Sequence, residues 1–239
     1  MALDEALMSR ARSTGEWVLR VYAWSAPTLS LGRHQRAAAA YDAAALGRAG
    51  VGVVRRPTGG RAILHDREVT YSVTAPATGT GQLRESYDRI NRLLVDGLRT
   101  LGADVEIAKT TRGSGLDFSP CFERPAPGEL VAGGRKLAGS AQWRDNGVLL
   151  QHGSILVDGD QASVSSLLRH PTAPPAPPAT LRALLGRTPP VTEVAAALFG
   201  AVRRREDRDA SELSVDRALR DAADELRRRY EDDAWTWRR

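Results

Sequence analysis

The sequence predicts an α+β fold, in which a mixed β-sheet fills the first two thirds of the chain and carries packed helices. Three observations lead to this prediction. Short runs rich in Val, Leu and Tyr alternate with turn residues over 16–74, an amphipathic helix pattern follows at 82–101, and the C-terminal third has helical patterning. A chain of 239 residues can bury one large core, so we expect a single domain over 1–239, helical from about residue 160.

The elements of the N-terminal part follow from composition and turn residues. Residues 16–31 predict two short strands joined by a Ser-Ala-Pro turn. The Ala-rich segment Tyr41–Ala49 predicts one short helix that ends at Gly50. Further strands are expected at 51–56, 61–65 and 68–74, with a loop at 57–60.

The helix at 82–101 is expected to pack across the sheet, because its apolar residues recur every three or four positions. A long irregular stretch, rich in Gly, Ser and Pro, follows at 109–128, and such loops are usually functional or disordered. Asp145-Asn146-Gly147 predicts a tight hairpin turn between two strands. Residues 171–179 predict a Pro-rich extended connector before the C-terminal helices.

Composition limits the class of protein. The single cysteine excludes an internal disulfide and a Cys-cluster metal site, and no apolar run has the length of a membrane-spanning helix. The N-terminus is unlike a signal peptide, so we expect a cytoplasmic protein. The net charge of +5 suits an acidic partner, but it is spread along the chain and is weak evidence for nucleic acid.

Cys121 is the first candidate for chemistry. A lone cysteine is commonly an inert buried apolar residue, and that interpretation stays open here. Its surroundings, Ser119-Pro120-Cys121-Phe122-Glu123-Arg124-Pro125, have no core periodicity and are closed by prolines on both sides. This context favours a cysteine that is placed for reaction as much as one that is packed.

Lys136 is the second candidate, because Lys109 and Lys136 are the only lysines in a chain whose other basic residues are arginines. It follows a Gly-Gly pair, and small residues surround it at 133–141. A surface lysine after a tight turn is the simpler interpretation. If it faces Cys121, its ammonium would lower the thiol pKa from the usual value of about 8.5.

The third candidate is the segment 55–66, which contains a Gly-Gly pair at Gly59 and Gly60 flanked by arginines. Its backbone N–H groups are suited to an anion or a thioester oxygen, although a plain connection between strands is the alternative. His65 and Asp66 are adjacent, so on a strand they would point to opposite faces. We expect His152 to be a structural histidine.

These segments together resemble the lipoate–protein ligase/biotin protein ligase catalytic domain family. The resemblance rests on MALDEAL at the N-terminus, RRPTGGRAILHDREVTYSV, CFERP, GRKLAGSAQ and LLQHGSIL, in the family's order. The resemblance covers nearly the whole chain, including the closing Asp233-Ala234-Trp235 segment. Within the family, the motifs are most similar to those of the octanoyltransferase branch. It implies the mixed-sheet catalytic domain of that family.

The resemblance implies an N-octanoyltransferase of lipoate biosynthesis. The donor would be octanoyl-acyl carrier protein and the acceptor a lysine of the glycine cleavage H protein, with Cys121 as nucleophile and Lys136 as the lysine that lowers its pKa. The implied acyl- and substrate-binding residues are Arg56, Thr58, Gly59, Gly60, His65, Gly139, Ser140 and Ala141. No metal or other cofactor is implied, since the thioester arrives activated, and we expect a monomer that binds neither membrane nor nucleic acid.

The sequence departs from the family pattern in two places. Gly128 stands before Glu129-Leu130, where the family usually has an aromatic residue, so a pocket wall is expected to differ. The chain also begins inside the family's first motif, so we expect the sheet edge to lack a preceding strand.

Three alternatives remain at this point. An ATP-dependent lipoate–protein ligase shares the Gly-Gly and GRK motifs but does not need the cysteine, and an octanoyl transamidase would keep it. A non-catalytic relative that binds carrier protein or nucleic acid is the alternative from a different class. Sensitivity to iodoacetamide separates the thiol route from the adenylate route.

Overall fold

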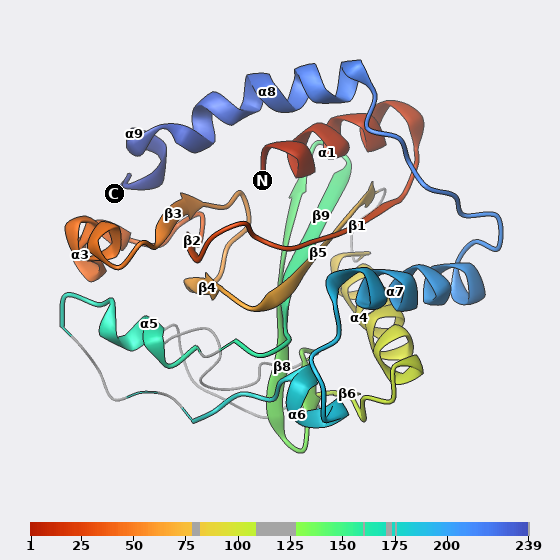
Figure 1. Cartoon of the computed structure of the whole chain (residues 1–239). Helices are drawn as coiled ribbons and strands as arrows, with labels where there is room; N and C mark the ends of the chain where they lie inside the picture. Colours follow the sequence, from red (N-terminus) through yellow and green to blue (C-terminus); the bar gives the residue numbers. More distant parts are fainter. Residues whose placement is uncertain (78–81, 109–127, 160, 171–173, 175, 239) are drawn as a thin grey trace.

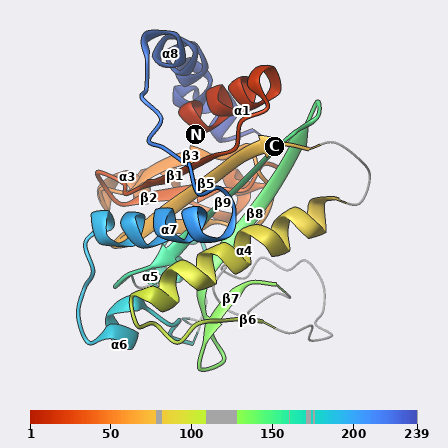
Figure 2. The same cartoon turned by 90° about the vertical axis from the view of Figure 1, so that its right-hand side faces the viewer.

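Two β-sheets form the centre of the protein. The computed structural model describes residues 1–77, 82–108, 128–159, 161–170, 174 and 176–238 (Figure 1). The larger sheet has six strands in the order β1-β5-β9-β8-β7-β6, and the smaller has three in the order β3-β2-β4. Helices pack against both faces of the larger sheet, which confirms the predicted α+β fold (Figure 2).

All neighbouring strands of the larger sheet are antiparallel. They are β1 (Val18–Tyr22), β5 (Glu68–Pro76), β6 (Glu106–Ile107), β7 (Leu130–Ala132), β8 (Arg135–Asp145) and β9 (Val148–Leu156). The smaller sheet joins β2 (Thr28–Leu31) to β3 (Gly52–Arg55) in parallel and to β4 (Ile63–His65) in antiparallel fashion. The two strands predicted within 16–31 therefore form, but each belongs to a different sheet.

The helices are α1 (Ala2–Thr14), α2 (Ala37–Ala40), α3 (Ala43–Arg48), α4 (Gln82–Thr100), α5 (Ser163–Ser166), α6 (Leu181–Leu185), α7 (Val191–Arg205), α8 (Arg217–Glu231) and α9 (Asp233–Thr236). The prediction of one helix over Tyr41–Ala49 was wrong at its start. Asp42 has an extended backbone, and its side chain accepts a hydrogen bond from the Ala44 N–H at 3.0 Å. It therefore caps α3 instead of continuing a helix.

Strand β5 has one apolar face and one polar face. Val69, Tyr71 and Val73 point toward α4 and α7, where Leu94 and Leu98 of α4 complete the main core. This confirms that the predicted long helix packs across the sheet, as Figure 2 shows. Alternate side chains of β5 point to the opposite face, because successive residues of a strand alternate.

Helix α1 and the smaller sheet cover that opposite face. Met8 and Ala11 of α1 pack on Val148 and Leu150 of β9, and α8 lies outside α1 (Figure 1). The smaller sheet contacts the larger one through Ile63 and Leu156. Polar residues at the centre of β5 and β9 are thus enclosed between α1 and the smaller sheet.

The hairpin between β8 and β9 forms as predicted. Asn146 and Gly147 have φ angles of 44° and 78°, the left-handed values that a tight two-residue turn needs. The predicted Pro-rich connector lies partly outside the described residues, and its described part contains neither helix nor strand. Within the described ranges, every helix is too short or too polar to cross a membrane.

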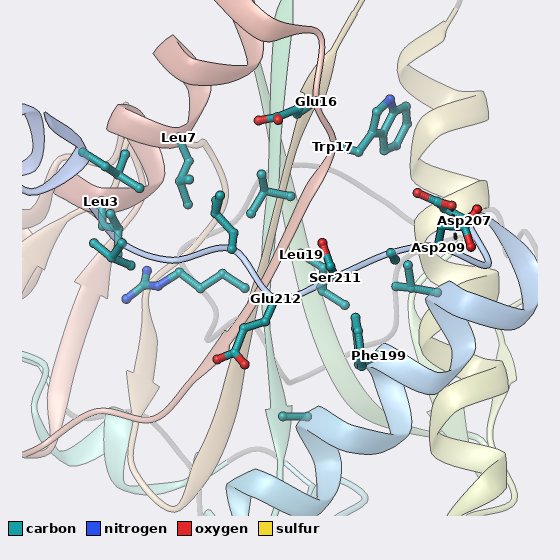
Figure 3. A pocket seen from close by; sticks show the side chains of 18 of the residues that line it. Leu3, Leu7, Glu16, Trp17, Leu19, Phe199, Asp207, Asp209, Ser211 and Glu212 are labelled. Carbon is teal, nitrogen blue, oxygen red and sulfur yellow. Dashed lines mark hydrogen bonds between the residues drawn. The ribbon is translucent and has the colours of Figure 1, made fainter. Parts of the chain in front are cut away.

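Strand β1 is the outermost strand of the larger sheet, so no further described strand covers that edge. A groove of about 630 Å³ runs beside it, between α1, α7 and the segment 207–215 (Figure 3). Trp17, Phe199 and Val215, which line it, are 46%, 37% and 39% exposed. Among the described residues, this edge of the sheet therefore borders an open, partly apolar groove.

Candidate active site

Cys121, the predicted nucleophile, lies outside the described residues, and backbone hydrogen bonds join the described residues on either side of its segment. The Gly128 N–H donates to the Ala108 carbonyl at 3.0 Å, and the Ala108 N–H donates to the Glu129 carbonyl at 2.8 Å. These bonds extend the pairing of β6 with β7 by one step. Ala108 and Gly128, the described residues on either side of this segment, therefore lie side by side next to the start of β7.

Lys136, near the start of β8, is 3% exposed and is not the surface lysine of the simpler interpretation. Its Nζ donates to the Glu129 Oε1 at 2.7 Å, and the Glu129 side chain is buried as well. The Gly133-Gly134 turn between β7 and β8 brings the two residues together, since it folds β8 back on β7. A buried ion pair thus lies next to the point where the cysteine segment ends.

Ser140 lies on the same face of β8 as Lys136, toward α4. Its Oγ is 2.6 Å from the Tyr71 hydroxyl, to which the fully buried Gln151 donates at 2.8 Å. Tyr87 of α4 faces the same region, and burial raises its pKa, with the nearby Glu129 carboxylate acting in the same direction. Its phenol therefore stays protonated at neutral pH.

The glycine loop after β3 is held by Arg56, which is 3% exposed. Its guanidinium donates to the carbonyl oxygens of Ser30, Gly59 and Arg61 at 2.8, 2.9 and 2.6 Å. Arg56 was predicted as a substrate-binding residue, and in the structure its guanidinium binds backbone carbonyl oxygens of the protein. It fixes the backbone of Gly59 and Gly60, so that their N–H groups keep one orientation.

His65, the last residue of β4, is also buried. Its Nε2 lies 2.8 Å from the Ser30 Oγ and its Nδ1 lies 3.2 Å from a Glu68 carboxylate oxygen, while its ring stacks on Trp24. Its carboxylate partner is thus Glu68 and not the adjacent Asp66, as the alternation of strand residues led us to expect. His65 connects the smaller sheet to β5.

Thr58 and His152 link the glycine loop to the larger sheet. The Thr58 Oγ1 is 2.6 Å from the His152 Nε2, and both residues are buried. Burial lowers the pKa of His152 from 6.5 to about 3, with the nearby Arg56 acting in the same direction and Asp4 opposing it. The ring is therefore neutral at physiological pH, which agrees with the structural role expected for it.

The predicted site residues fall into two groups, on opposite faces of the larger sheet. Lys136 and Ser140 face α4. Arg56, Thr58 and His65 lie on the other face, near the structural histidine His152. Across the β8–β9 ladder, Gly139 pairs with Ser154 and Ala141 with His152. The backbone of the sheet, including that of β8, therefore lies between the two groups.

The sequence analysis overlooked Asn91, Gln151, Tyr71 and the role of Glu129. Asn91 is fully buried, and it lies four residues after Tyr87 on the otherwise apolar face of α4. A polar residue at a core position of an amphipathic helix was the available signal, because such groups are retained only with hydrogen-bond partners.

We expect acid to destabilise the protein through His152. The unfolded chain binds a proton near the ordinary pKa of 6.5, whereas the folded state binds it only near 3, so stability is complete above pH 6.5 and falls as the pH drops toward 3. Urea unfolding should show a loss of about 2 kcal/mol from this group between pH 7 and pH 5. His152→Gln should lose that component, and an unchanged pH dependence in this variant would contradict the assignment.

The fold and site together define an α+β catalytic domain in which a glycine loop and a buried lysine flank one β-hairpin. The chain belongs to the lipoyl protein ligase A/B catalytic domain family, whose model matches residues 1–203. It is 48% identical over 182 residues to the octanoyltransferase LipM of Kyrpidia tusciae, covering 72% of this chain and 66% of that protein. It is also 44% identical over 170 residues to the octanoyltransferase LipM of Staphylococcus aureus, and this match covers 67% of this chain and 62% of that protein.

Solved structures share the fold over nearly the whole chain. A bi-partite lipoate protein ligase from Thermoplasma acidophilum matches with a TM-score of 0.76 at 22% identity, covering 99% of this chain and 89% of that chain. Lipoate-protein ligase A bound with ATP matches with a TM-score of 0.74 at 24% identity, covering 99% and 92%. The chain spans just under two thirds of the length of the curated relatives named above, 66% and 62%.

Proposed function

We propose that this protein is an octanoyl-[acyl-carrier-protein]:protein N-octanoyltransferase of lipoate biosynthesis that works through a thioester on Cys121. The observation that carries the proposal is the buried Lys136–Glu129 pair beside the end of the cysteine segment, in a chain similar to proteins named octanoyltransferase LipM. A buried ammonium favours a thiolate in its neighbourhood, and a thiolate is the form of cysteine that attacks a thioester.

In the first step the Cys121 thiolate attacks the carbonyl carbon of the octanoyl thioester on acyl carrier protein. The new carbon–sulfur bond forms, the old one breaks, and the carrier's phosphopantetheine thiolate leaves and takes up a proton from water. Backbone N–H groups of Gly59, Gly60 and Gly139 are the proposed donors to the transient oxyanion, each contributing about 3 kcal/mol.

In the second step a lysine amine of the acceptor attacks the enzyme thioester. The carbon–nitrogen bond forms, the Cys121 thiolate leaves, and the amine proton passes to water or to the thiolate. We propose the glycine cleavage H protein as acceptor and Ser140 and Ala141 as residues along the acyl group. Arg56 and Thr58 would support that site through their hydrogen bonds at the glycine loop. His65 would support it through the Ser30 hydroxyl, which also accepts a hydrogen bond from Arg56.

The partners and compartment follow from the same proposal. An acyl carrier protein is an acidic partner, and the net charge of +5 supports its docking. We propose that the protein acts in the cytoplasm as a monomer, as a single catalytic domain over residues 1–239.

An ATP-dependent lipoate–protein ligase is the second candidate, favoured by the fold it shares with lipoate-protein ligase A. Transfer to H protein should be followed by mass spectrometry with octanoyl-acyl carrier protein alone, and separately with octanoate and ATP. We expect transfer from the carrier without ATP, blocked by iodoacetamide and absent in Cys121→Ala. Transfer only from octanoate with ATP, retained in Cys121→Ala, would establish the ligase instead.

A further inference from the structure

A chain of buried hydrogen bonds crosses from the larger sheet to α4. Tyr71, Asn91 and Gln151 are each 0% exposed. The Gln151 Nε2 donates to the Tyr71 hydroxyl at 2.8 Å and to the Asn91 Oδ1 at 3.0 Å, so both of its protons are used. The Asn91 Nδ2 then donates to the Gly128 carbonyl at 2.6 Å. Because the Asn91 Nδ2 donates to a carbonyl, the Asn91 Oδ1 is the atom that accepts from Gln151.

This chain ends at the residue that closes the cysteine segment. Gly128 has a φ of +88°, and a Cβ placed on it would lie 2.9 Å from the Tyr87 Cε1. Its carbonyl accepts from Asn91, and its N–H donates to Ala108 at 3.0 Å. The ring of Tyr87 thus occupies the space that a side chain at position 128 would need, and α4 fixes Gly128 from two directions.

Burying several amide groups in an otherwise apolar core is costly unless every bond is made. Leu94 and Leu98 follow Asn91 along the helix, and both are part of the apolar core. The Asn91 amide makes two hydrogen bonds in this setting, one with the buried Gln151 and one with the Gly128 carbonyl, and the second links α4 to the backbone next to Glu129.

We infer that Asn91 is a positioning residue for the proposed thiol chemistry, acting through Gly128 and Glu129 on Lys136. Glu129 follows Gly128 directly, and its carboxylate is 2.7 Å from the Lys136 Nζ. Fixing the Gly128 carbonyl fixes the backbone from which Glu129 reaches Lys136. This inference rests on the proposed function, in which the Lys136 ammonium stabilises the Cys121 thiolate.

The single cysteine makes a direct test possible, because alkylation by iodoacetamide reports on one thiol. The rate of alkylation should be measured by intact mass between pH 5 and pH 10 in the wild type and in Asn91→Leu. We expect the midpoint of the wild type below 8.5 and a shift toward 8.5 of about one pH unit in the variant. The first transfer step should slow at least about tenfold, with the KM for octanoyl carrier within about threefold.

Arg99→Leu is the matched control. Arg99 is also on α4 and also donates to a backbone carbonyl, that of Val105 at 3.0 Å, away from Gly128. It should leave the alkylation midpoint unchanged. Gly128→Ala is a second variant, used if Asn91→Leu does not fold. It should shift the pH midpoint of alkylation in the same direction as Asn91→Leu.

The inference is overturned if folded Asn91→Leu and Gly128→Ala keep the wild-type midpoint and rate, or if Arg99→Leu shifts the midpoint as far. The proposed function fails separately. If the wild type has a lowered thiol pKa that depends on Asn91 but transfers no octanoyl group, the positioning stands and the reaction is wrong. If transfer needs Cys121 but ignores Asn91, the reaction stands and the positioning is wrong.

Discussion

Replacing Lys136 with methionine is expected to slow octanoyl transfer at least about a hundredfold. Methionine matches the length of the buried side chain but removes the ammonium that lies 2.7 Å from Glu129. Without that charge the thiol of Cys121 should titrate near its ordinary pKa, so less thiolate is present at neutral pH. The rate of carrier-dependent transfer and the pH profile of iodoacetamide alkylation measure the two consequences.

The same substitution should also cost about 3 kcal/mol of stability, because it removes one member of a buried ion pair. Adding Glu129→Gln should restore much of this stability but none of the activity, which separates the two roles of the lysine. Arg135→Met is the control, since Arg135 is the exposed neighbour on the same strand. Full activity in Lys136→Met would contradict the proposed role.

Replacing Arg55 with methionine is expected to destabilise the protein by about 3–5 kcal/mol. Arg55 is 0% exposed, and its guanidinium donates to backbone carbonyls of two distant segments. These are Gly32, Arg33 and Gln35 at 2.7, 3.3 and 2.8 Å, and Trp235, Thr236 and Arg238 at 3.1, 3.0 and 3.2 Å. The arginine therefore joins the C-terminal segment to the smaller sheet.

Urea unfolding measures the loss, and limited trypsin digestion should show early cleavage near α9 in this variant. Arg217→Met is the control, because the Arg217 side chain is 94% exposed and its ion pair with Asp221 is at 3.6 Å. That change should stay within about 0.5 kcal/mol. Equal stabilities of the two variants would refute the role assigned to Arg55.

Local patterns predicted the elements that depend on local physics. The spacing of Tyr87, Ile90, Leu94 and Leu98 predicted α4 and its packing on the sheet, and Asn146-Gly147 predicted the hairpin. Patterns within a segment cannot name a distant partner. The two strands within 16–31 were expected, but β1 pairs with β5 and β2 pairs with β3, which no local signal specifies.

The candidate site shows the same division. The motifs singled out Lys136 and the glycine loop, whereas the contacts that give them their environment come from elsewhere in the chain. Asn91 is far from Gly128 in sequence, so its bond to that carbonyl depends on how α4 crosses the sheet. The lysine was expected at the surface by its turn alone, and its burial follows from the pairing of β7 with β8.

The central claim is that Cys121 carries the octanoyl group. Intact mass spectrometry of the purified protein, after incubation with octanoyl-acyl carrier protein and without ATP, tests it most directly. The account predicts one octanoyl adduct that hydroxylamine removes and that Cys121→Ala does not form. An enzyme that transfers octanoyl groups from the carrier at full rate in Cys121→Ala would contradict it.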